Sequence, residues 1–105
     1  MPSKRTIATD ISKDVRIAVI NRDTPTTLPQ CIFCGSVYNL QIAHYIPRSA
    51  GGLGIKENLA CACYVCHSKL DQSTYRKPML VQFERYLKRH YKDWDSNKLK
   101  YKKGE

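Results

Sequence analysis

Four of the five cysteines in this 105-residue chain form two CxxC pairs, Cys31 with Cys34 and Cys63 with Cys66. Each pair can bring two thiolates to one tetrahedral ion, and four thiolates suit Zn²⁺. We therefore predict a structural zinc site, which is coordinatively closed and implies stability, not catalysis. A redox role for these thiols is the alternative. The remaining cysteine, Cys61, is interpreted as a small buried hydrophobic residue.

Two histidines and an asparagine accompany the cysteine pairs, in the order His44, Asn58 and His67. Imidazole has a pKa of about 6.5, so it can accept a proton near neutral pH. His44 ends an apolar run that looks like a β-strand. Taken alone, it is better explained as a core histidine whose ring nitrogens are satisfied.

The order CxxC, His, Asn, CxxCH resembles the HNH endonuclease family, and the layout resembles the small HNH proteins of phages and prophages. The resemblance includes a basic N-terminal helix, the loop RSAGGLGIKEN and the ending YLKRHYKDWDSNKLKYKKG. It implies an α+β fold, a ββα-metal hairpin and helix beside a structural zinc, with flanking N- and C-terminal helices. By position it implies His44 as general base, Asn58 as the middle residue and His67 as ligand of a catalytic divalent ion.

The implied activity is metal-dependent hydrolysis of DNA phosphodiester bonds, by nicking or by double-strand cleavage. A base deprotonates water in line with the leaving 3′ oxygen, and one ion such as Mg²⁺, Mn²⁺ or Ni²⁺ stabilises the phosphate and the leaving group. The joint spacing of His44, Asn58 and His67 favours this site over a core histidine. Through its phage relatives, the resemblance implies double-stranded DNA, terminase and portal proteins as partners, and the cytoplasm of a bacterial host as the location.

The chain departs from the family at Ala43, directly before His44. Many members have an acidic residue or a second histidine there that helps bind the catalytic metal, and a methyl group cannot do so. Asp71 lies four residues after His67 in a predicted helix, so the two can share one ion. The Asn58 amide oxygen, phosphate oxygens and waters are further candidates. Gln41 is a poorer candidate, because it lies two residues before Ala43, which is about 6.6 Å along the strand.

Basic residues outnumber acidic ones by 18 to 9, and the formal net charge is +9. From residue 76 to the end there are ten basic and four acidic residues, whereas residues 31–72 have three and two. A polyanionic partner held by the flanks is the leading interpretation, and a merely solubilising surface is the alternative. Arg48 either clamps a phosphate or is an exposed loop charge. The candidate nucleic-acid-binding residues are Arg48, Lys56, Lys69, Arg85, Lys88 and Arg89.

The pattern predicts one domain over residues 1–105. Its parts are an N-terminal helix over 9–22, a zinc-bound ββα core over 31–75 with strands at 37–45 and 59–62, a basic helix over 78–94 that starts at Pro78, and a loose basic tail over 98–105. No stretch approaches the roughly 20 apolar residues of a membrane span, and the N-terminus lacks the apolar core of a secretory signal, so we expect no membrane partner. Besides a nuclease, two hypotheses stay open: a non-catalytic Cys₄ zinc module that binds DNA or packaging proteins through its basic flanks, and a protein-interaction subunit.

Overall fold

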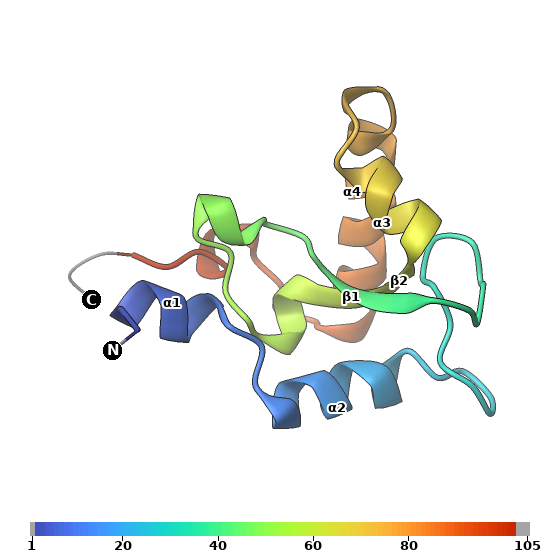
Figure 1. The fold of residues 1–105 in the computed structure, drawn as a ribbon, viewed down its shortest axis with the longest axis horizontal. Coiled ribbons are helices and arrows are strands. Elements are labelled where there is room, and N and C mark those ends of the chain that lie inside the picture. Colours follow the sequence, from blue (N-terminus) through green and yellow to red (C-terminus); the bar gives the residue numbers. More distant parts are fainter. Residues whose placement is uncertain (1, 103–105) are drawn as a thin grey trace.

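The computed structural model describes residues 2–102, and its centre is an antiparallel hairpin of strands β1 (Leu40–His44) and β2 (Leu59–Cys63) (Figure 1). The first residue of β1 pairs with the last residue of β2. All five residues of β2 are buried. The first strand is shorter than predicted because Asn39 has a φ of 51°, a left-handed conformation that interrupts extended backbone.

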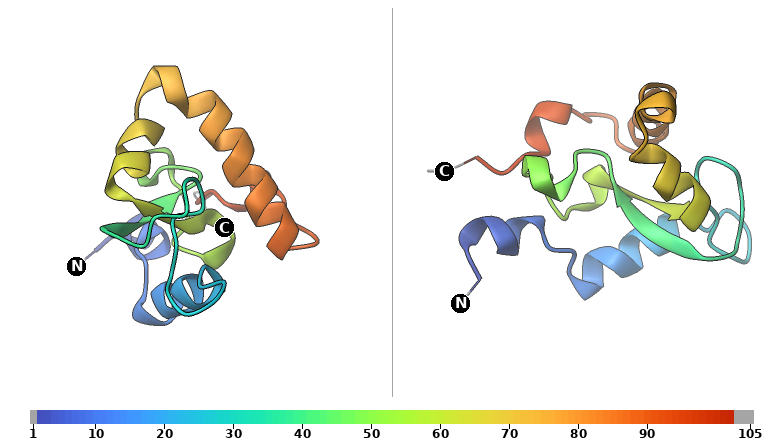
Figure 2. Two further views of the ribbon diagram at one scale, coloured as in Figure 1. Left: turned by 90° about the vertical axis from the view of Figure 1, so that its right-hand side faces the viewer. Right: turned by 45° about the horizontal axis from the view of Figure 1, so that its top comes forward.

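Helices cover both faces of the hairpin (Figures 1 and 2). Helix α2 (Lys13–Arg22) lies along one face, where Val19 packs with side chains of β2. Helices α3 (Tyr64–Leu70) and α4 (Ser73–His90) cover the other face. This mixed arrangement of helices and a two-stranded sheet confirms the predicted α+β fold, with a ββα unit between flanking helices.

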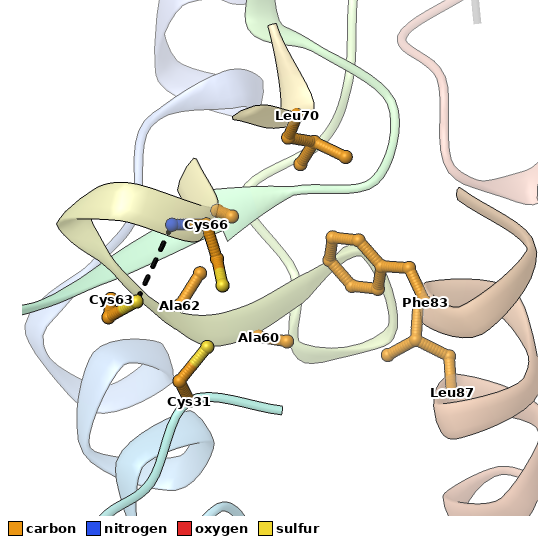
Figure 3. Packing of buried hydrophobic residues seen from close by; sticks show 9 residues of the cluster. Cys31, Ala60, Ala62, Cys63, Cys66, Leu70, Phe83 and Leu87 are labelled. Carbon is orange, nitrogen blue, oxygen red and sulfur yellow. Dashed lines mark hydrogen bonds between the residues drawn. The ribbon is translucent and has the colours of Figure 1, made fainter. Parts of the chain in front are cut away.

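The larger core cluster lies between the hairpin and α4 (Figure 3). Successive residues of a strand point to opposite faces of a sheet. Ala43 therefore faces this cluster, while His44 faces the side covered by α2. The buried members of the cluster are Cys31, Ala43, Ala60, Ala62, Cys63, Cys66, Leu70, Phe83 and Leu87.

The N-terminal segment is two helices, not the single helix predicted over 9–22. Helix α1 spans Lys4–Thr9, and α2 starts only after its N-cap Ser12, whose hydroxyl accepts a hydrogen bond from Val15 N–H. Asp10 between them has extended backbone (φ −71°, ψ 148°). Serine at an N-cap satisfies a backbone donor that the helix leaves free, and this local bond separates the two helices.

The C-terminal helix also differs from the prediction of 78–94. Helix α4 begins at Ser73, so Pro78 lies inside it as the sixth residue. The first turn is closed by hydrogen bonds from Tyr75 and Arg76 N–H to the Gln72 carbonyl. Pro78 is exposed and has no backbone N–H, so the helix loses one hydrogen bond there. The helix nevertheless continues to His90.

Beyond α4 the chain turns back toward the hairpin, so the loose tail predicted over 98–105 is wrong for residues 98–102. Leu99 is buried. Its carbonyl accepts from Leu53 N–H at 2.8 Å, and Tyr101 N–H donates to the Gly51 carbonyl at 2.7 Å. Residues 103–105 of the predicted tail lie outside the described residues. Within residues 2–102, no helix combines the length and apolar character needed to cross a bilayer.

A buried ion pair joins the helices to the hairpin. Asp23, directly after α2, accepts from Arg22 Nε at 2.8 Å and from Cys61 N–H in β2 at 2.8 Å. The Tyr86 hydroxyl of α4 donates to the same carboxylate. Arg22 also donates to the Leu59 carbonyl at 2.6 Å. Because every charge is paired, burying the pair leaves no uncompensated charge, and α2, β2 and α4 are held in one arrangement.

Candidate functional site

The four predicted zinc ligands come together at one end of the hairpin. The sulfur atoms of Cys31, Cys34, Cys63 and Cys66 all lie within 4.8 Å of one another. A tetrahedral ion with Zn–S distances of about 2.3 Å holds its sulfurs about 3.8 Å apart. The Sγ atoms of Cys34 and Cys63 are 3.6 Å apart, which suits that geometry.

Backbone donors are aimed at these sulfurs, as thiolate ligands require. Phe33 N–H donates to Cys31 Sγ at 3.4 Å, and Cys66 N–H donates to Cys63 Sγ at 3.4 Å (Figure 3). Burial raises the pKa of the Cys63 thiol, but the Cys66 N–H and the other thiols outweigh burial and lower this pKa to about 7. The donor set therefore fits a structural Zn²⁺, which ties the segment before β1 to the start of α3.

Cys61 takes no part in this cluster. It is buried on the α2 face of β2 with Val19 and Leu59. Burial is the main cause that raises its pKa to about 12. The prediction that Cys61 is a buried hydrophobic residue is confirmed.

A second site lies at the other end of the hairpin, in a pocket of about 140 Å³. It contains the candidate base, the candidate metal ligands and two arginines. A larger hollow of about 440 Å³ along residues 90–99 contains none of them. The smaller pocket is lined by His44, Tyr45, Pro47, Arg48, His67, Leu70, Asp71, Arg76 and Leu80.

His44 is half-buried at the end of β1, with Nε2 3.4 Å from the carbonyl oxygen of Thr9, the last residue of α1. A carbonyl only accepts, so in this contact Nε2 carries the hydrogen and Nδ1 keeps a lone pair. Burial lowers the pKa of His44, and the charges of Arg48 and His67 lower it further, while the Thr9 contact opposes them. The neutral imidazole is therefore favoured.

His67 and Asp71 lie at the other side of the same pocket, one helical turn apart. His67 is in α3, and Asp71 is its C-cap residue. The His67 Nδ1 is 2.6 Å from Gln41 Oε1 on β1. Within residues 2–102, the four cysteines are the only cluster of three or more potential metal-binding side chains. One imidazole and one carboxylate suit Mn²⁺, Ni²⁺ or Mg²⁺, and water would complete the shell.

Asn58 is fully buried and its side chain does not reach the pocket. Its Oδ1 accepts from Ile46 N–H at 2.8 Å, and its Nδ2 donates to the carbonyls of Ile46 and Leu53 at 3.1 and 2.9 Å. Its backbone carbonyl accepts from Tyr45 N–H at 2.8 Å, next to His44. The amide oxygen is thus engaged by the backbone rather than directed at an ion.

The loop of residues 46–54 that follows His44 is held from three sides. Asn58 anchors it from within, and residues 99–101 pair with it on one side. On another side Gly54 N–H donates to the Ala8 carbonyl of α1 at 3.0 Å. A Cβ on Gly54 would lie 2.0 Å from the Asp10 carbonyl oxygen, so only glycine allows this approach.

The two arginines of the pocket come from different elements. Arg48, in the loop, is paired with the Asp10 carboxylate, and both side chains are half-exposed. Arg76, in the first turn of α4, was not identified from the sequence. No motif marks it, because its approach to the pocket depends on the angle between α3 and α4.

The other five predicted nucleic-acid-binding residues lie outside the pocket: Lys56, Lys69, Arg85, Lys88 and Arg89. Arg89 follows Arg76 by 13 residues, which is about 20 Å along a helix. Lys88 is paired with Glu84 at 2.9 Å and is exposed. The cations of α4 are therefore spread along the helix, away from the pocket.

Comparison with known proteins agrees with this geometry. Residues 31–73 match the family model described as HNH endonuclease. No curated protein matches the chain. The matched segment contains both cysteine pairs, the whole hairpin and α3, so it includes His44, Asn58 and His67. Residues 31–73 are therefore similar to an HNH endonuclease domain, and the remaining residues lie outside the match.

Proposed function

We propose that this protein is a metal-dependent endonuclease that hydrolyses phosphodiester bonds of double-stranded DNA. One observation carries the proposal: a half-buried histidine, a histidine–aspartate pair and two arginines line the same pocket, although they come from four segments of the chain. These are the groups that phosphodiester hydrolysis needs, namely a base, a cation site and phosphate-binding donors.

In the proposed mechanism, His44 is the general base. Its Nδ1 accepts the proton of the attacking water while Nε2–H points to the Thr9 carbonyl. That carbonyl then stabilises the imidazolium that forms. The lowered pKa supports this role because an imidazole must be neutral before it can accept a proton.

His67 and Asp71 would hold the divalent ion, Mg²⁺, Mn²⁺ or Ni²⁺, next to the scissile phosphate. When bound, such an ion supplies positive charge that stabilises the phosphate and the leaving oxygen. Arg48 and Arg76 bind the phosphate oxygens through their guanidinium forks. For Arg48 this means exchanging the Asp10 carboxylate for a phosphate.

The basic flanks support DNA as the substrate, with the exposed cations of α4 contacting the backbone away from the pocket. The resemblance to small phage HNH proteins supports a role in phage DNA processing or packaging, with terminase and portal proteins as partners. It also supports a location in the cytoplasm of the bacterial host.

Ala43 favours a second candidate function, a non-catalytic zinc module that binds DNA or packaging proteins through its basic flanks. Ala43 has no exposed surface and faces the core. The family's usual metal ligand at this position is therefore absent. Position 43 is also buried, so it is not accessible to a metal ion from solvent.

Plasmid cleavage distinguishes the two functions. Supercoiled DNA is incubated with Mg²⁺, Mn²⁺ or Ni²⁺ and wild type, His44→Ala or His90→Ala. His90 is exposed and lies outside the pocket, so its variant is the matched control. We expect cleavage by wild type and His90→Ala and a loss of at least about a hundredfold in His44→Ala. Folded, zinc-loaded wild type that cleaves with none of the three ions would support the binding module instead.

A further inference from the structure

The contact between Gln41 and His67 is the one polar side-chain contact between β1 and α3 among the described residues. Gln41 and Ala43 share a strand face, because they are two residues apart. That face is covered by α3. On this face Ala43 occupies the position of the family's metal ligand, and its methyl group is buried. The polar contact to His67 comes instead from Gln41, two residues earlier in β1. The distance of 2.6 Å between Gln41 Oε1 and His67 Nδ1 is short for a hydrogen bond.

With Gln41 Oε1 facing His67 Nδ1, this contact favours one tautomer of His67. A neutral imidazole has one N–H donor and one lone pair. Because an amide oxygen only accepts, the proton sits on Nδ1 and the lone pair on Nε2. His67 lines the pocket and Gln41 does not. Because Gln41 engages Nδ1, the lone pair on Nε2 is left for another ligand.

We propose that Gln41 is a positioning residue, which locks His67 in the tautomer whose Nε2 is free to bind the divalent ion. The inference rests on the proposed function, because it concerns the same ion. A histidine that binds a metal through one nitrogen commonly donates its other N–H to an acceptor, which sets the ring orientation and raises the basicity of the ligand. Gln41 supplies that acceptor from a rigid strand.

In this arrangement Gln41 is not itself a ligand of the ion. Its Oε1 is engaged by His67, so the side chain orients a ligand without contacting the ion. Gln41→Glu retains an acceptor in the same place and should preserve the tautomer. Gln41→Met has similar length and no comparable acceptor, so it should release the ring.

The test uses the zinc-loaded full chain with ¹⁵N-labelled histidine and is independent of DNA cleavage. Long-range ¹H–¹⁵N spectra above the pKa of imidazole report which nitrogen is protonated, and Mn²⁺ titration followed by line broadening at His67 reports ion binding. Gln82→Met is the control. Gln82 is also exposed, but its side-chain amide donates a hydrogen bond to the Phe33 carbonyl and does not contact His67.

We expect protonated Nδ1 in wild type, Gln41→Glu and Gln82→Met, and a mixture of tautomers in Gln41→Met. Mn²⁺ affinity should fall about tenfold in Gln41→Met alone. A His67 protonated on Nε2 in wild type, or a Gln41→Met variant with unchanged tautomer and Mn²⁺ affinity, would overturn the inference. If the spectra and the affinities are as expected but no DNA is cleaved, the inference stands and the proposed nuclease activity fails.

Discussion

At the scale of single residues, the pocket gives its two histidines different surroundings, which suit the proposed roles of base and metal ligand. His44 is half-buried, contacts a backbone carbonyl and has a lowered pKa. His67 is held by Gln41 at its Nδ1. The two side chains have the same chemistry, and their surroundings separate their roles.

The lowered pKa of His44 predicts the acid limb of the pH–rate profile. A histidine whose pKa lies below its ordinary value of about 6.5 stays neutral, and so able to act as base, at lower pH. We therefore expect kcat/KM for plasmid cleavage, measured between about pH 5 and 8, to fall only below about 6.5. A limb centred above that value would contradict the assignment of His44 as the base that burial has tuned.

The same shift predicts a direction for stability. Between the lowered pKa and the ordinary one, the unfolded chain binds more protons at His44 than the folded chain does, so folding stability is lost as pH falls through this window. His44→Gln removes this contribution. We expect denaturant midpoints of wild type to fall more steeply than those of His44→Gln as the pH is lowered from about 7 to 5. Parallel curves would count against burial as the cause.

Substitutions of Arg76 and Arg85, which both lie in α4, should distinguish an effect on catalysis from an effect on DNA binding. Arg76 lines the pocket, whereas Arg85 is exposed outside it. We expect Arg76→Ala to lower kcat by on the order of ten- to a hundredfold, because it removes a donor to the charged phosphate. Arg85→Ala should leave kcat unchanged and reduce the salt dependence of DNA binding by about one phosphate contact. Equal effects of the two variants on kcat would contradict this division.

At the scale of elements, the loop of residues 46–54 depends on Asn58. A buried amide with three hydrogen bonds joins β2 to both ends of this loop. Helix α1 and residues 99–101 hold the loop from outside. The loop carries Arg48 and begins two residues after His44, so its geometry sets that of the pocket.

Asn58→Asp tests whether Asn58 is a loop anchor or a metal ligand. The new carboxylate oxygen would face the carbonyls of Ile46 and Leu53, and a buried unpaired charge costs about 3–5 kcal/mol. We expect a loss of that size in chemical denaturation and no gain in Mn²⁺ affinity. A ligand role predicts the opposite, since a carboxylate binds such ions better than an amide.

At the scale of the whole molecule, the four-cysteine cluster and the Arg22–Asp23 pair bring together segments that are distant in sequence. The four cysteines join residues 31–34 to residues 63–66, and three of them belong to the core. A structural zinc contributes on the order of 10 kcal/mol to folding. A small domain has a total stability of about 5–15 kcal/mol, so we expect folding of this chain to depend on the metal.

Removing zinc should therefore unfold the protein rather than merely inactivate it. We expect excess chelator to abolish the cooperative thermal transition in circular dichroism as bound zinc, measured by elemental analysis, is lost. Cys66→Ala should behave like the chelated protein. Cys61→Ala, which removes a buried sulfur outside the cluster, should keep one zinc per chain. Native helix content in metal-free protein would show that the core is sufficient alone.

The sequence by itself determined the four-cysteine cluster, the hairpin and the order of the candidate residues, because these follow from local spacing. It also predicted that His67 and Asp71 lie on one side of a helix, and both residues line the pocket. Its errors were the single helix over 9–22, the start at Pro78 and the loose tail. Each arose where a cap or a contact distant in sequence outweighs local pattern, as for Ser12 and Leu99.

Only the tertiary structure decided the environment of the site. Asn58 became a buried anchor, because both ends of the loop of residues 46–54 meet at its amide. The place of Arg76 in the pocket and the contact of Gln41 with His67 depend on how α4 and α3 pack on the hairpin, which no local pattern encodes. The spacing of residues along the chain identifies the groups that can do chemistry. The packing of distant segments determines which of their atoms face one another, and therefore which role each group can have.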